Sequence, residues 1–129
     1  MSATPSELVT AFLQAFMSGD VEKASGMVSD DFCFRAPMHQ GEGSKAAYFA
    51  GAERKTRFIH AFRILRQWTQ GNDVCTVYEI DVRTTEGSAT MAMSEWHTVR
   101  AGRVSSTYMV FDSASRAATL LRNALGAHH

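Results

Sequence analysis

The beginning of the chain carries hydrophobic side chains at the spacing of an amphipathic helix. Thr4 and Glu7 fit a capping box, and Pro5 takes the first helical position, where no amide donor is missed. Ser18 and Gly19 mark the end of this helix. The stripe that it would bury consists of Leu8, Val9, Phe12, Leu13, Phe16 and Met17.

Two further helices and a short strand follow before the pattern changes. Asp20 is a suitable cap for a shorter helix, and Ser44 for a third helix that runs to about Lys55. Between them, residues 32–36 alternate between apolar and polar side chains up to Pro37, which predicts a short strand. Three helices are therefore expected in the N-terminal half.

From residue 56 onward the hydrophobic period is two, as in β-strands. Four segments rich in β-branched and aromatic residues are separated by turn signals at residues 71–73, 86–87 and 101–102. These segments are residues 57–69, 74–84, 88–100 and 103–111. Consecutive hairpins of this kind predict an antiparallel meander. With the helices in front, the pattern indicates an α+β fold and a single domain over residues 1–129.

The predicted strands are longer than the usual five or six residues. Long strands coil strongly, and a coiled sheet that is closed by helices on one face leaves a cavity at its open end. We therefore expect three N-terminal helices to pack on a strongly curved antiparallel sheet and to enclose an apolar pocket.

The composition narrows the choice of partners. Thirteen basic and thirteen acidic residues cancel, which argues against nucleic acid or an anionic membrane as a partner and favours self-association. Neither a leader peptide nor a run of about 18 apolar residues is visible. Cys33 and Cys75 are too few for a disulfide framework, so a cytoplasmic location is expected. The closing His128 and His129 fit the remnant of a tag.

The sequence shows no motif for a metal, a nucleotide or a covalent catalyst. His39, His60 and His97 are too widely spaced to form a metal site on one element. No glycine-rich loop follows a strand, and no nucleophile elbow is present. We therefore expect no metal and no cofactor.

Several short segments together resemble the nuclear-transport-factor-2-like superfamily, and within it the SnoaL-like branch. Together these segments cover nearly the whole chain. They are the first helix at residues 8–16 with the following Ser18-Gly19-Asp20, the entry to the first strand at 28–32, the loop and helix at 41–49, and the last hairpin, which begins at 95–104 and ends at 111–112. The resemblance implies a cone of the cystatin-like type that holds a small apolar molecule and forms a homodimer through the outer sheet face. Members include ketosteroid isomerases, polyketide cyclases and epoxide hydrolases, and others only bind ligands.

The resemblance also suggests which residues carry chemistry. In isomerase-like members a carboxylate precedes the proline of the first strand, where this chain has Ala36. The helix-one phenol of those members corresponds to Phe12, so an isomerase reaction is doubtful. Their acidic donor corresponds to Glu95, and the aspartate that acts in cyclase-like members corresponds to Asp112.

The residues themselves make Glu95 the first candidate for catalysis. On a strand it shares one face with Met91, Met93 and His97. If this face lines the cone, burial would raise the pKa of Glu95 and favour a neutral acid, and His97 would complete an acid–base pair. Alternatively, Glu95 is paired with an arginine or lies at a dimer face, and His97 is a core histidine whose hydrogen bonds are satisfied.

The other candidates each have a structural alternative. Asp112 is either a general base at the pocket mouth or the cap of a turn. Tyr78 or Tyr108 could supply an oxyanion donor, or both pack in the core. The remaining expected pocket residues are His60 and a set of apolar walls, which could equally be ordinary core: Phe12, Phe16, Phe34, Met91 and Met93.

Two functional hypotheses follow. The first is a cone that binds a small apolar molecule and carries out cofactor-free acid–base chemistry, of a cyclase-like or isomerase-like kind. The second is a non-catalytic module for ligand binding or protein association. A cavity of a few hundred cubic ångströms around buried Glu95 and His97 would favour the first, and a cone filled by Phe12, Phe34 and Met91 the second.

Overall fold

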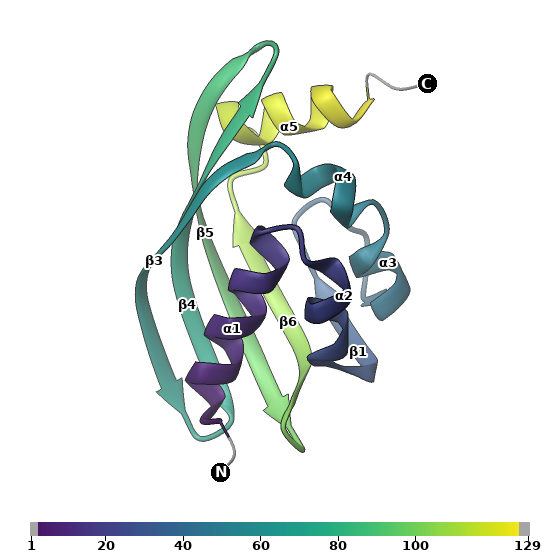
Figure 1. Ribbon diagram of the computed structural model, residues 1–129, viewed down its shortest axis with the longest axis vertical. Coiled ribbons are helices and arrows are strands. Elements are labelled where there is room, and N and C mark those ends of the chain that lie inside the picture. The colour runs from purple at the N-terminus through teal and green to yellow at the C-terminus, as the bar shows by residue number, and fades with distance from the viewer. Residues whose placement is uncertain (1–2, 127–129) are drawn as a thin grey trace.

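A strongly curved sheet with helices packed on its concave side organises the molecule (Figure 1). The structure is a computed structural model that describes residues 3–126, so His128 and His129 lie outside the described residues. The elements in chain order are α1 (Pro5–Met17), α2 (Val21–Gly26), β1 (Val28–Arg35), β2 (Gly43–Ser44), α3 (Lys45–Phe49), α4 (Ala52–Thr56), β3 (Ile59–Gln70), β4 (Asp73–Thr84), β5 (Gly87–Arg100), β6 (Arg103–Phe111) and α5 (Arg116–Gly126). The α+β class expected from the sequence is confirmed.

The strand order departs from a simple meander at one point. The described residues form a six-stranded sheet in the order β2-β1-β6-β5-β4-β3, in which β3 to β6 pair antiparallel as expected. β1 is longer than predicted and pairs parallel with β6. The pairing of β1 with β6 cannot be recognised from local periodicity, because the long connection between them contains the other three strands of the meander.

Helix α1 begins as the sequence predicts. The Thr4 hydroxyl accepts the backbone N–H of Glu7, and the Glu7 carboxylate accepts the N–H of Thr4, at 3.2 and 2.9 Å. The apolar stripe of the helix faces the sheet, with Val9, Phe12 and Leu13 fully buried. This packing fixes one wall of the space between helices and sheet.

The predicted third helix is wrong as a continuous element. It is divided into α3 and α4 at Ala50 and Gly51, where Gly51 adopts a left-handed conformation with φ of 71°. Glycine reaches this region without steric cost, and the break redirects the chain before β3 begins. In Figure 1, α4 lies close to α5, which crosses the far end of the sheet. No helix within residues 3–126 has the length and apolar character needed to cross a membrane.

Candidate functional site

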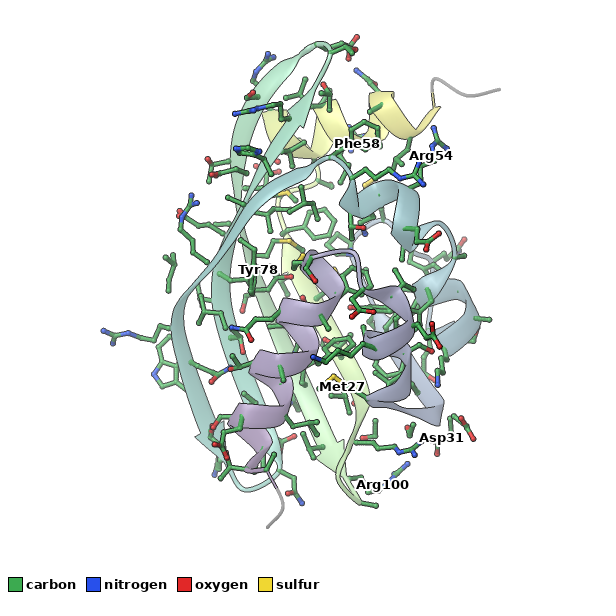
Figure 2. All side chains as sticks on the ribbon, in the orientation of Figure 1. Met27, Asp31, Arg54, Phe58, Tyr78 and Arg100 are labelled. Atoms are coloured by element: carbon green, nitrogen blue, oxygen red, sulfur yellow. The ribbon has the colours of Figure 1, made fainter. Side chains whose placement is uncertain are left out.

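The register of the sheet decides which side chains face the helices. Tyr78 on β4 lies opposite Met93 on β5, and His97 on β5 lies opposite Thr107 on β6. Even-numbered residues of β4 and odd-numbered residues of β5 and β6 therefore share the concave side in this part of the sheet. Figure 2 shows Tyr78 between the sheet and the helices.

A polar cluster is buried on this face around Glu95. The Glu95 side chain is 1% exposed, and both of its oxygens accept hydrogen bonds from hydroxyl groups. The Tyr78 phenol donates to Oε2, and the Thr107 hydroxyl donates to Oε1 at 3.0 Å. His97, which is fully buried, places Nε2 3.3 Å from Oε1. Three strands thus contribute to the surroundings of one carboxylate.

These neighbours determine the charge of Glu95. Burial is the largest single influence and raises the pKa of the carboxyl. The electrostatic interaction and close contact with His97, together with the hydroxyls of Tyr78 and Thr107, outweigh burial, so the pKa of Glu95 is lowered from its ordinary value. The expectation of a neutral acid at this position is therefore wrong, because sequence spacing shows the burial but not the donors on β4 and β6.

The imidazole of His97 is held by packing more than by hydrogen bonds. Phe12 approaches it edge to face, with ring centroids 5.8 Å apart. The Nε2 contact with Glu95 has the distance of an ion pair but not the alignment of a hydrogen bond, and neither ring nitrogen has a hydrogen-bond partner among residues 3–126. A buried polar group that is left unsatisfied requires an explanation, and groups of this kind often lie beside functional sites.

A cavity of about 290 Å³ opens beside this cluster. Glu95 reaches its wall, whereas His97 lies behind Glu95 and outside the lining. Five of the side chains that the sequence suggested as pocket walls are found there, together with residues of α5: Phe16, Phe34, Tyr78, Met91 and Met93. The cone is therefore hollow in the region where these residues meet, although their role in binding stays a prediction.

The profile of the SnoaL-like domain family matches residues 9–107, which is most of the chain. The chain belongs to the SnoaL-like domain family. A comparison with curated proteins finds no significant match. Among solved structures, an NTF2-like protein of unknown function from Cytophaga hutchinsonii ATCC 33406 is 25% identical, with a TM-score of 0.70 over 88% of this chain and 94% of that one.

Two further solved structures share the fold at lower sequence identity. A loop-truncation variant of IdmH is 18% identical, with a TM-score of 0.76 over 95% of this chain and 100% of that one. TerC, co-crystallised with polyporic acid, is 19% identical, with a TM-score of 0.71 over 92% of this chain and 99% of that one. At these identities the likeness concerns the fold.

Three residues expected in the pocket of this SnoaL-like domain lie elsewhere. Phe12 is buried in the core beneath His97 and outside the cavity lining. His60 is exposed, because its neighbour Ile59 takes the inward position at the start of β3. Tyr108 is 49% exposed, because it lies opposite Trp96 on the outer face of the sheet. The predicted pocket positions of these three residues are therefore wrong.

Asp112 does not join the polar cluster of the domain. It is exposed at the end of β6, where Oδ1 accepts the N–H of Ala114 at 2.9 Å and its carbonyl accepts the N–H of Ser115 at 3.1 Å. These contacts are those of a turn cap, the structural alternative that the sequence left open. Asp112 is also absent from the cavity lining, so the structure gives no support for a general base at this position.

Two lining residues were not recognised in the sequence. Tyr48 on α3 packs against Phe16, Phe32 and Phe34 and reaches the cavity, and its hydroxyl has no hydrogen-bond partner in the described part of the chain. Burial and the charge of Glu95 raise the pKa of Tyr48, which keeps it a neutral donor. Lys55 on α4 also lines the cavity. No local signal pointed to Lys55, because the chain reverses direction at Gly51 between the two residues.

Among residues 3–126, no three His, Cys, Asp or Glu side chains are grouped as ligands for a metal ion.

Proposed function

We propose that this SnoaL-like domain binds a small, largely apolar molecule in its cavity and that Glu95 exchanges a proton with the polar group of that molecule. The observation that carries the proposal is the position of the Glu95 carboxyl group, which is almost fully buried yet lies on the wall of the cavity. Ionisable side chains are seldom fully buried without a partner or a role. Here thioether and aromatic groups of Met91, Met93 and Phe34 surround the position where a ligand would meet it.

The chemistry open to this site is cofactor-free proton transfer of a cyclase-like or isomerase-like kind. An ionised carboxylate oxygen can accept two hydrogen bonds, and among the described residues Oε2 of Glu95 accepts only one, from Tyr78. The remaining acceptor position can take an acidic proton from the ligand. The Tyr48 hydroxyl is then available as a donor to the ligand oxygen that gains negative charge. Glu95 then returns the proton to the ligand, which completes the step.

A second candidate is binding without turnover. The lowered pKa of Glu95 makes it a weak base, and Ala36 and Phe12 stand where isomerase-like members carry catalytic groups. In this case Glu95 orients a hydroxyl or amide of the ligand by a hydrogen bond. The co-crystallisation of TerC with polyporic acid supports ligand binding by this fold without deciding the reaction.

The test uses 2-naphthalenemethanol, whose hydroxyl can donate to Glu95, and 2-methylnaphthalene, which lacks the donor. A hydrogen bond to a charged group contributes about 1.5–3 kcal/mol, so Glu95→Gln should weaken binding of the alcohol roughly tenfold or more. Binding of the hydrocarbon should change little. Calorimetry measures both, and Glu22→Gln, at an exposed position of α2, is the matched control. Equal affinity of the alcohol for wild type and Glu95→Gln would contradict the site.

We further propose that two copies associate through the outer face of the sheet. Cross-strand neighbours form a row there from Trp68 through Cys75 and Trp96 to Tyr108. Both tryptophans are 52% exposed and the tyrosine is 49% exposed. Exposed aromatic side chains in a contiguous patch are typical of protein interfaces.

A cytoplasmic location also stays a proposal. Cys33 and Cys75 are free thiols, which suits a reducing compartment.

A further inference from the structure

Lys55 lies on the wall of the cavity and has no polar partner in the part of the chain that the structure describes. Lys55 is partly buried on α4 and lines the same space as Glu95. Within residues 3–126 its side chain forms no hydrogen bond and no ion pair. A strongly hydrated point charge is costly to keep beside apolar groups unless something compensates it.

The neighbouring cations are already engaged. Arg54, also on α4, donates to the carbonyl oxygens of Ala124 and Leu125 at 3.2 and 2.7 Å and so ties α4 to α5 (Figure 2). Arg122, which lines the cavity too, donates to the carbonyl of Ser113 at 2.8 Å. Of the described lysine and arginine residues that line the cavity, Lys55 is the one whose side chain makes no hydrogen bond to the protein, whereas the Arg122 guanidinium is held by neutral acceptors.

Lys55 and Glu95 differ in how far their side chains are satisfied by the protein. Glu95 accepts two hydroxyl donors and lies beside His97, so its carboxylate already has partners within the protein. Burial lowers the pKa of Lys55, and the distant charge of Glu95 opposes this only in part. An anion brought close to Lys55 would favour its charged form and would be held in surroundings that screen the pair weakly.

We propose that the ligand of this cavity is an amphipathic acid, whose carboxylate pairs with Lys55 at the α4 end while its apolar body extends toward Glu95. This inference rests on the proposed function, because it names the class of molecule that the same cavity binds. The cavity then has two polar ends: an ammonium group that holds the anion, and a carboxylate that accepts a hydrogen bond from a donor elsewhere on the ligand. An apolar molecule without an acid group would leave Lys55 uncompensated.

The test compares two molecules of the same shape, 2-naphthoate and its neutral amide 2-naphthamide. Calorimetry on the full chain at neutral pH and constant ionic strength gives the two dissociation constants. Wild type should bind 2-naphthoate at least about tenfold more tightly than 2-naphthamide, which corresponds to about 1.4 kcal/mol. Lys55→Met should bring the ratio close to one by weakening naphthoate alone, and Lys55→Arg should keep most of the preference. Lys23→Met removes the same charge at an exposed position of α2 and should change nothing.

The outcomes separate this inference from the proposed function. A wild-type ratio near one, or a ratio that survives in Lys55→Met, overturns the assignment of Lys55. If 2-naphthalenemethanol still binds in that case, and binds more weakly to Glu95→Gln, the proposed function stands and only the acid is lost. If neither the alcohol nor the acid binds, both proposals fall together. The wild-type ratio needs no variant, so the inference can be overturned even if Lys55→Met folds poorly.

Discussion

The hydrogen bond from Tyr78 to Glu95 is the contact through which the buried charge can be measured most directly. Tyr78→Phe removes one hydroxyl and keeps the ring, which is fully buried and packs edge to face on Phe62 with centroids 5.3 Å apart. The substitution therefore leaves the apolar packing almost unchanged. What is lost is one of the donors that hold the Glu95 carboxylate in its ionised form.

The size of the effect follows from the partners that remain. A hydrogen bond to a charged group contributes about 1.5–3 kcal/mol. Glu95 keeps the Thr107 hydroxyl at 3.0 Å and the His97 nitrogen at 3.3 Å, so the loss should lie near the middle of this range, at about 2 kcal/mol. For a domain of this length that corresponds to a decrease in melting temperature on the order of 8 °C.

The assay is urea denaturation followed by circular dichroism at pH 7, on four proteins that form a double-mutant cycle. These are wild type, Tyr78→Phe, Glu95→Gln and the double variant. If the hydroxyl acts on a charge, its removal from Glu95→Gln should cost only about 1 kcal/mol or less, the value of a neutral hydrogen bond. Ser88→Ala deletes an exposed hydroxyl at the start of β5 and should change stability by less than about 0.5 kcal/mol.

Two results would refute the reasoning. A cost of Tyr78→Phe as small as that of Ser88→Ala would mean that the phenol contributes nothing to the buried carboxylate. A cost of Tyr78→Phe that is the same in wild type and in Glu95→Gln would mean that the hydroxyl acts on packing and not on charge.

Three further predictions concern pH, packing and association. Because the pKa of Glu95 is lowered in the folded protein, its contribution to folding stability is complete above the ordinary value of 4.5 and is lost as pH falls through the lower value. Wild type should therefore lose stability more steeply than Glu95→Gln below about pH 4.5. Parallel pH profiles of the two proteins would contradict this. A Cβ at Gly43 would overlap the Phe34 ring, so Gly43→Ala should cost about 1–3 kcal/mol, and an unchanged melting temperature would show that the ring is not a fixed wall. Trp96→Ala should lower the mass measured by light scattering at micromolar concentration, and the same dimer in both proteins, or a monomeric wild type, would remove the outer-face assignment.

The sequence alone determined the elements and much of the inward face. The capping box at Thr4, the stripe of α1 and the alternation of β5 depend on residues a few positions apart, and local sterics and hydrogen bonds settle such features before any long-range contact forms. For this reason Glu95 and His97 could be assigned to one face of a strand, and that face is buried.

Only the tertiary structure decided how these elements combine. The face that β6 presents depends on its register with β5, which places Thr107 and not Tyr108 beside Glu95, and a shift of one residue would have reversed them. The break at Gly51 directs Lys55 toward the cavity, and the donors that lower the pKa of Glu95 come from β4 and β6. Register, chain reversal and electrostatics all depend on contacts between residues that are distant in sequence. A local sequence pattern does not say how far apart such residues lie in space.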